Sequence, residues 1–225
     1  MKVPFAVFAS GSGTNMQALL DHEGEGAAYR IELLITDREC AAEERARALG
    51  RAVHRVVFPF SSELLRLLKR HHAEGILLAG FLRLVPAEVC AAYRGRILNI
   101  HPALLPAFGG KGMYGHHVHE AVLRSGAALS GPTIHFVDER YDEGRILAQW
   151  PVPVLPGDTP DTLAARVLRV EHALYPAAAD ALARAVQGGW PDAGPAPGFR
   201  WPGGGHAPDA ELGDRITQAF GGAGD

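Results

Sequence analysis

Two polar residues at the end of an apolar run are the first candidates for chemistry. The stretch from Arg96 to Ile100 predicts a buried strand, which ends at about His101 because Pro102 has no N–H to donate to a neighbouring strand. Asn99 and His101 are two residues apart, so they project to the same side of an extended chain. An amide beside an imidazole suits a carbonyl oxygen that becomes an oxyanion. The alternative is a strand end whose two polar side chains are satisfied within the protein.

A Gly-rich turn is the second candidate. The stretch from Ser10 to Asn15 follows an apolar run and precedes a helical pattern, which predicts a strand, a turn and a helix. Backbone N–H groups at a helix N-terminus favour an anion. Gly13, Thr14 and Asn15 are therefore predicted to bind a phosphate, although a turn that binds nothing is the alternative.

A dinucleotide-binding turn competes with this interpretation. That motif requires a third glycine and an acidic residue at the end of the second strand. Asp37 supplies the acid, but Met16 occupies the position of the third glycine, where it would crowd a pyrophosphate. A single phosphate monoester fits the turn better.

Two further segments carry charged residues near predicted strand ends. Asp142 lies in an acidic loop, and its carboxylate would favour and orient the imidazolium of His101 if the loop folded over that residue. A solvated acidic loop is the alternative. Gly80 to Val85 is an apolar loop that would pair with a flat heteroaromatic ligand, with Arg83 holding a carboxylate or pairing with the protein. Ordinary core packing is the alternative there.

Several histidines invite a metal interpretation, namely His71, His72, His116, His117 and His119. Residues 116 and 119 are neighbours on a predicted helix. Because no cysteine or third ligand completes a zinc spacing, surface histidines are the better explanation and no metal is predicted.

The elements that position these residues alternate between strands and helices. This order predicts an α/β fold with a doubly wound, mainly parallel sheet and helices on both faces. The predicted strands are Val3–Ala9, Ile31–Thr36, Val53–Phe58, Gly75–Gly80 and Arg96–Ile100, and the helices between them are Met16–Asp21, Ala41–Leu49, Ser61–His72 and Pro86–Tyr93.

The second half of the chain departs from this alternation. A helix over His116–Leu123 precedes two strands, Thr133–Val137 and Arg145–Val154, joined in a hairpin-like arrangement by a polar loop. A last helix starts at Thr159 and Pro160, and Pro176 is expected to kink or break it. We expect residues 1–187 to form one domain and the Gly/Pro-rich residues 188–225 to be a partly irregular tail.

Composition narrows the classes of protein further. The 225 residues carry a formal net charge of -3 and a pI of about 6.4, which argues against a nucleic-acid partner. No run is long enough to span a membrane, and the start of the sequence does not resemble a signal peptide. Cys40 and Cys90 are expected to stay reduced. We expect a cytoplasmic monomer or homodimer whose partners are small molecules.

Taken together, several stretches resemble one enzyme family. The sequence is similar to the phosphoribosylglycinamide formyltransferases, or glycinamide ribonucleotide transformylases, of the folate-dependent formyltransferase superfamily. The resemblance covers Lys2 to about Ala185 and is carried by Ser10–Asn15, Leu78–Arg83, Leu98–Pro106, Gly131–Val137, Asp142–Gly144 and Glu171–Pro176.

The resemblance implies a Rossmann-like formyltransferase fold and a one-carbon transferase of de novo purine biosynthesis. Such an enzyme moves a formyl group from 10-formyltetrahydrofolate, a co-substrate, to the amine of glycinamide ribonucleotide without a metal. It does so by amine attack and an oxyanion intermediate.

The resemblance also implies roles for individual residues. The catalytic residues would be Asn99, His101 and Asp142. The ribonucleotide would bind Gly13, Thr14 and Asn15 through its phosphate, Glu171 through its ribose, and approach Gly80. The folate would contact Leu82, Arg83, Leu84, Val85, Asn99, Val137, Asp138, Glu139 and Tyr141, and the pocket would be lined by Thr133 and His135.

Other functions remain open on the sequence alone. A transfer-RNA formyltransferase would carry a basic second domain, whereas residues 188–225 are few and not basic. A formyltetrahydrofolate hydrolase is expected to have an extra N-terminal regulatory domain. A nicotinamide-dependent dehydrogenase would use Asp37, against which Met16 argues. A non-catalytic nucleotide- or folate-binding protein would keep the cleft without chemistry.

Overall fold

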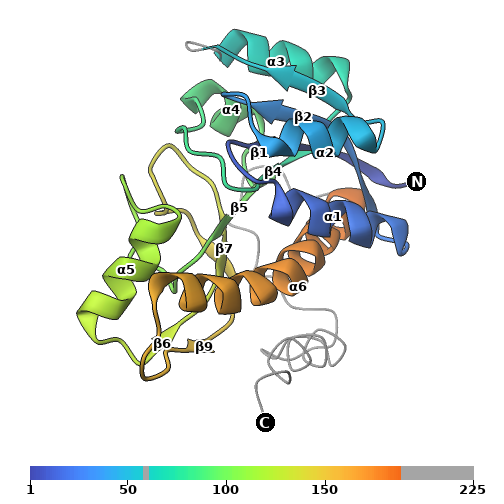
Figure 1. The fold of residues 1–225 in the computed structure, drawn as a ribbon. Helices are drawn as coiled ribbons and strands as arrows, with labels where there is room; N and C mark the ends of the chain where they lie inside the picture. The colour runs from blue at the N-terminus through green and yellow to red at the C-terminus, as the bar shows by residue number, and fades with distance from the viewer. Residues whose placement is uncertain (58–60, 189–225) are drawn as a thin grey trace.

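The computed structural model describes residues 1–57 and 61–188. Within them, seven strands form one sheet in the order β3-β2-β1-β4-β5-β7-β8, and two short strands form a second sheet (Figure 1). The strands are β1 (Val3–Ala9), β2 (Tyr29–Thr36), β3 (Ala52–Arg55), β4 (Gly75–Leu78), β5 (Ile97–His101), β6 (Leu129–Ser130), β7 (Thr133–Phe136), β8 (Ile146–Gln149) and β9 (Val152–Pro153).

The first five strands of the large sheet pair in parallel, and β7 and β8 complete it as antiparallel strands. Strand order reverses between β1 and β4, and such a reversal opens a crevice at the carboxyl ends of the strands. The predicted doubly wound, mainly parallel sheet of the Rossmann-like type is confirmed.

Six helices cover the sheet within the described residues: α1 (Thr14–Gly24), α2 (Ala41–Ala48), α3 (Ser61–Arg70), α4 (Ala87–Ala92), α5 (His116–Ser125) and α6 (Pro160–Gln187). Apolar side chains of α1, α2, α5 and α6 share a core with one face of the sheet, and those of α3 and α4 share a core with the other. In β1, Phe5 and Val7 belong to the first core, and Ala6 and Phe8 belong to the second. Burial on both faces explains why this strand is apolar at every position.

The end of the hairpin differs from the prediction. Instead of one strand from Arg145 to Val154, the chain forms β8, breaks near Pro151, and continues as β9, which pairs with β6 in the separate sheet. Proline cannot donate a hydrogen bond to a neighbouring strand, so it ends the ladder. The short strand β6 was not predicted.

The last helix also differs from the prediction. Thr159 caps α6 by accepting a hydrogen bond from the backbone N–H of Thr162, as the sequence suggests. The helix then runs through Pro176 to Gln187, so of the expected kink or break the break is wrong. Pro176 and its neighbour Tyr175 are buried, and this packing holds the helix although one backbone donor is missing. The tail predicted beyond Gly188 lies outside the described residues.

Candidate active site

A cavity of about 790 Å³ opens at the carboxyl ends of β1, β4 and β5. Six segments that are distant in sequence line it: residues 10–15, 79–82, 99–102, 110–116 with 119, and 141–142, and one face of α6. A cavity of this size is typical of a site for a small molecule. Asn99 and His101 lie together at its wall, as the strand pattern predicts.

The amide of Asn99 is held by a histidine on the neighbouring strand. Nδ1 of His135 lies 2.8 Å from the carbonyl oxygen of Phe136, so Nδ1 carries the proton and Nε2 is left as an acceptor. Nδ2 of Asn99 donates to this Nε2 across 3.0 Å. His135 is buried behind Asn99 and is not among the residues that line the cavity. The hydrogen bond from Asn99 to His135 fixes the orientation of the amide, with Nδ2 toward His135.

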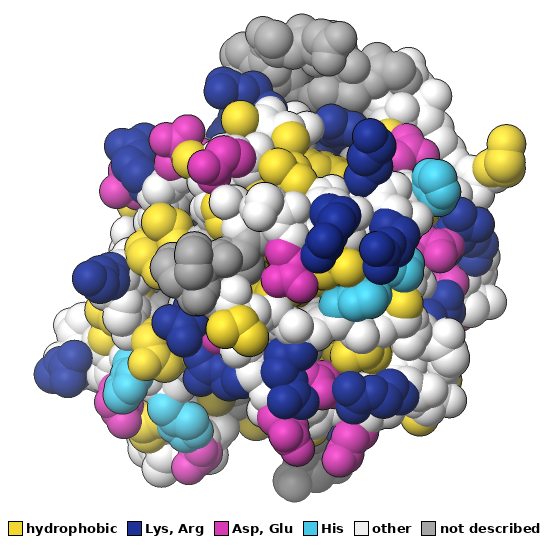
Figure 2. Space-filling view, turned by 90° about the horizontal axis from the view of Figure 1, so that it is seen from above, with side chains coloured by type: hydrophobic (Ala, Val, Ile, Leu, Met, Phe, Trp, Pro, Cys, Tyr) yellow, Lys and Arg dark blue, Asp and Glu magenta, His cyan; other side chains and the backbone are white. Residues whose placement is uncertain are grey.

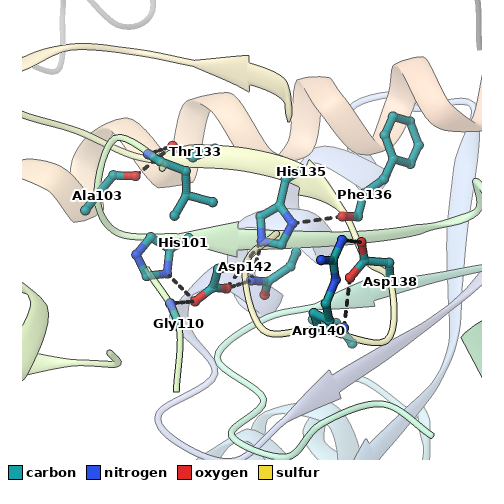
Figure 3. A network of polar contacts seen from close by, with 12 residues as sticks. His101, Ala103, Gly110, Thr133, His135, Phe136, Asp138, Arg140 and Asp142 are labelled. Atoms are coloured by element: carbon teal, nitrogen blue, oxygen red, sulfur yellow. Dashed lines mark hydrogen bonds and ion pairs between the residues drawn. The ribbon is translucent and has the colours of Figure 1, made fainter. Parts of the chain in front are cut away.

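Asp142 lies at the meeting point of the polar residues. Its Oδ1 is 3.5 Å from Nδ2 of Asn99 and from Nε2 of His135, and its Oδ2 accepts a 2.9 Å hydrogen bond from the backbone N–H of Gly110. Figure 3 shows Gly110, His101 and His135 around this carboxylate. The loop between β7 and β8 thus folds over β5, and the alternative of a solvated acidic loop does not hold for Asp142.

The backbone of Asp142 has a φ of 56°, in the left-handed region. Aspartate tolerates this region better than most residues, and such strain persists only where surrounding contacts hold it. Burial alone would raise the pKa of Asp142, but its polar neighbours, among them the backbone N–H of Gly110 that donates to Oδ2, outweigh burial and lower the pKa. The side chain is therefore a carboxylate at neutral pH.

His101 is almost fully buried, and both ring nitrogens face protein groups. Nε2 donates to the carbonyl oxygen of Phe108 across 2.9 Å, and Nδ1 lies 3.6 Å from Oδ2 of Asp142. Burial lowers the pKa of His101 below its ordinary value, although Asp142 and Phe108 act in the opposite direction. We expected Asp142 to favour the imidazolium. It does so, but burial outweighs it, and the imidazole is neutral at neutral pH.

Thr133 holds the chain that follows β5. Its hydroxyl donates to the carbonyl oxygen of Ala103 and accepts hydrogen bonds from the backbone N–H of Leu105 and the amide of Gln149. Figure 3 shows Thr133 above the strand that carries His101, pointing toward Ala103. Thr133 is fully buried and lies outside the cavity, so it supports the site from behind.

The Gly-rich turn forms the opposite end of the cavity. Gly13 is the N-cap of α1 with a φ of 75°, and a Cβ at this position would lie 2.8 Å from the Cα of Ala42. Glycine is needed there for its conformation and for the close approach of α2. No side chain caps α1 at Gly13, so the first N–H groups of the helix have no capping partner, and Thr14 and Asn15 at its start line the cavity.

Glu171 connects α6 to this turn. Its Oε2 accepts a 2.6 Å hydrogen bond from Nδ2 of Asn15, and the residue lines the cavity although its side chain is buried. Burial raises the pKa of Glu171, and the bond from Asn15 offsets part of this effect. Gly80, with a φ of 74°, lines the cavity between the turn and β5.

Only some of the residues predicted to bind the folate line the cavity. Leu82 and Tyr141 line the cavity. Val85 is buried in the core beneath α3 and α4, Val137 packs against the same core, and Leu84 is partly exposed. The structure thus brings two of these five side chains to the cavity wall.

The charged members of this set pair with other protein groups. Arg83 donates to Oδ2 of Asp37 across 3.0 Å, so in this structure it pairs with protein. Asp138 accepts from the backbone N–H of Arg140, and both residues are drawn at the far end of the loop in Figure 3. Glu139 is exposed on that loop. None of Arg83, Asp138 and Glu139 is among the cavity-lining residues.

Sequence reasoning missed one buried histidine at the cavity. The sequence predicts a surface position for His119 on α5, but the residue is almost fully buried, and its Nδ1 has no partner among the described residues. Burial, with smaller contributions from His116 and His101, lowers the pKa of His119 to about 4. Its position on the apolar face of α5, beside Val118 and Val122, was the available signal.

In the described part of the chain, no group of three or more His, Cys, Asp or Glu side chains is placed to hold a metal ion. No described helix is long and apolar enough to cross a membrane.

Comparison with known proteins gives a consistent result. The family model described as formyl transferase matches residues 3–179. A phosphoribosylglycinamide formyltransferase named as chloroplastic from Arabidopsis thaliana is 51% identical over 184 residues, covering 76% of this chain and 62% of that protein. Its counterpart from Vigna unguiculata is 47% identical over 188 residues, covering 79% of this chain and 60% of the relative. The chain thus spans about three-fifths of the length of these relatives.

Solved structures agree in fold. The crystal structure of glycinamide ribonucleotide transformylase 1 from Symbiobacterium toebii is 38% identical, with a TM-score of 0.76, and the match covers 81% of this chain and 88% of that chain.

Proposed function

Because this chain belongs to the formyl transferase family, we propose that it transfers a formyl group from 10-formyltetrahydrofolate to the amine of glycinamide ribonucleotide. The observation that carries the proposal is the convergence of Asn99, His101 and Asp142 at one end of a cavity whose other end is a Gly-rich turn. One end suits acyl transfer, and the other suits a phosphate. The step belongs to de novo purine biosynthesis.

The ribonucleotide is anchored at the turn. The first N–H groups of α1, with Thr14 and Asn15, bind the phosphate, because a helix N-terminus favours an anion. Glu171 then accepts hydrogen bonds from the ribose hydroxyls, and its bond from Asn15 aligns the two groups. Gly80 leaves space for the substrate to pass toward β5.

The folate co-substrate supplies the formyl group and occupies the wall next to Leu82, Tyr141 and Asn99. The backbone after β4 and the β7–β8 loop offer donors and acceptors to a flat pterin. For Arg83 to bind a carboxylate of the folate, it would have to leave Asp37, with which it pairs in this structure. Besides Arg83, five of the residues predicted to bind the folate do not line the cavity, and we propose that they shape the loop after β4 and the β7–β8 loop: Leu84, Val85, Val137, Asp138 and Glu139.

Asn99 stabilises the oxyanion. The unprotonated glycyl amine attacks the formyl carbon, and the carbonyl oxygen gains negative charge as the C–N bond forms. One hydrogen of the Asn99 amide is used by His135 at 3.0 Å, while the other has only the 3.5 Å contact with Asp142. That second N–H is available to the oxyanion.

His101, assisted by Asp142, transfers the proton that the attacking amine releases. Since the pKa of His101 is lowered, the neutral imidazole accepts at Nδ1 the proton that the attacking amine releases. The resulting Nδ1–H faces the Asp142 carboxylate 3.6 Å away, which stabilises the imidazolium. The proton passes to the folate nitrogen as its bond to the formyl carbon breaks. This relay needs no metal.

Turnover measured by absorbance with both substrates tests the proposal. We expect folate deformylation only when glycinamide ribonucleotide is present, with one formylated product for each folate released. Deformylation without the ribonucleotide would instead identify a formyltetrahydrofolate hydrolase, and binding of both ligands without turnover would identify a non-catalytic binding protein. A cytoplasmic location and the monomeric or homodimeric state stay predictions.

A further inference from the structure

Two histidines face each other at the edge of the sheet, away from the cavity. His54 lies on β3, an edge strand, and His71 follows the last residue of α3. Their Nε2 atoms are 3.2 Å apart, and their ring planes make an angle of 64°. Both side chains are half-buried. Neither residue lines the proposed active-site cavity.

The separation of the two nitrogens matches that of two ligands on one metal ion. Zinc binds imidazole nitrogen at about 2.0–2.1 Å, so two nitrogens of a tetrahedral site are about 3.3 Å apart. A direct N–H···N hydrogen bond has a similar length, but it uses the lone pair of only one ring. Among the described residues, no other group is hydrogen-bonded to either ring. The Nε2 lone pairs of His54 and His71 are therefore both available to bind one cation.

Both histidine side chains are partly exposed, so solvent reaches the pair. Arg70 and Glu63, both on α3, are the charged groups that act on His54 besides His71, and their charges oppose each other. Figure 2 views the molecule from the side on which α3 lies in Figure 1, and His side chains lie there at the surface among Lys and Arg. Water can reach a metal bound at this face and complete its coordination.

We propose that His54 and His71 form a binding site for a divalent transition-metal ion that prefers imidazole, such as Zn²⁺, with water in the remaining positions. Imidazole ligands suit zinc, copper and nickel, whereas magnesium prefers oxygen. A metal here joins the edge strand β3 to the end of α3. Because it binds the folded chain, it stabilises the fold by mass action.

Calorimetric titration of the metal-free full chain with Zn²⁺ tests the site. We expect the parent chain to bind one equivalent, and both His54→Gln and His71→Gln to bind it with a dissociation constant at least about tenfold higher. His117→Gln, at an exposed histidine of α5, is the matched control and should bind like the parent chain. Mg²⁺ should give no saturable heat.

Long-range ¹H–¹⁵N spectra provide a second readout that does not depend on affinity. Zn²⁺ should shift the imidazole nitrogens of His54 and His71 in the parent chain, and circular dichroism should show that both variants are folded. If the parent chain fails to bind Zn²⁺, or either variant binds it unchanged, the proposal is overturned and the pair is an N–H···N hydrogen bond only.

Discussion

The side-chain amide of Asn15 donates a 2.6 Å hydrogen bond to Oε2 of Glu171, although the two residues are 156 positions apart in sequence. The bond connects the Gly-rich turn after β1 to the middle of α6. It also keeps a buried carboxylate hydrogen-bonded at the cavity wall. The phosphate end and the ribose end of the proposed ribonucleotide site therefore form one unit.

Replacement of Asn15 by alanine should weaken binding of the ribonucleotide by roughly tenfold or more, since a hydrogen bond to a charged group contributes about 1.5–3 kcal/mol. Loss of the donor should also raise further the pKa of Glu171, which burial already raises. Calorimetry with glycinamide ribonucleotide measures the affinity. Gln17→Ala, on the same helix but bonded to Asp21, is the control, and equal affinities in the two variants would argue against this site.

Asp142→Asn should lower kcat by about 10²–10⁴, the range for general acid–base catalysis, and leave both KM values within a few-fold. The amide keeps an acceptor for the N–H of Gly110 but carries no charge to stabilise the imidazolium of His101. Steady-state kinetics measure the effect. Glu143→Gln in the same loop, paired with the exposed Arg140, should have normal rates. Normal turnover of Asp142→Asn would remove Asp142 from the mechanism.

The pKa of His101 should lie below the ordinary value for histidine, because burial outweighs the opposing charge of Asp142. The neutral imidazole is the proton acceptor, so kcat/KM should fall as the pH decreases through this lowered pKa. Asp142→Asn removes a charge that raises the pKa and should move it lower still. NMR titration of the His101 ring measures both values. An upward shift in the variant would contradict the assignment.

Gly13→Ala should destabilise the protein by about 1–3 kcal/mol, the usual cost of a strained backbone conformation. Its φ is 75°, and the new Cβ would lie 2.8 Å from the Cα of Ala42. Gly11→Ala, in the same turn, meets nothing within 4 Å and is the matched control. Urea unfolding of both variants gives the difference, and equal stabilities would mean that α2 moves away without cost.

Glu43→Gln should destabilise the protein at neutral pH by roughly 3 kcal/mol, as expected from the lowering of its pKa from 4.5 to about 2. Hydrogen bonds from Arg55, Thr36 and Arg47 outweigh burial and lower the pKa of this buried carboxyl from 4.5 to about 2. Because the folded-state pKa is depressed, the contribution is complete above about pH 4.5 and is lost as the pH falls toward 2.

Unfolding free energies measured between pH 2 and pH 7 test this dependence. The difference between the parent chain and Glu43→Gln should shrink across the acid part of that range. Glu44→Gln, at the exposed neighbouring position, should change stability little at any pH. A difference for Glu43→Gln that is constant with pH would show that packing, and not charge, is the cause.

The sequence by itself determined the alternation of elements and the ends of the parallel strands. In β1 and β5 the apolar runs are bounded by glycine and proline, so local periodicity and backbone restrictions were sufficient to place Asn99, His101 and the turn at Gly13. The resemblance to formyltransferases then supplied the reaction and added Asp142 to the catalytic residues. These features depend on neighbours in sequence or on a motif.

Only the tertiary structure decided which of those groups meet and in what state. It placed His135 behind Asn99, paired Arg83 with Asp37, and brought His54 to His71. Likewise, the net pKa of His101 depends on burial by elements that are distant in the chain, and this burial outweighs Asp142. Side-chain partners and desolvation arise from packing between remote segments, and no local pattern encodes them.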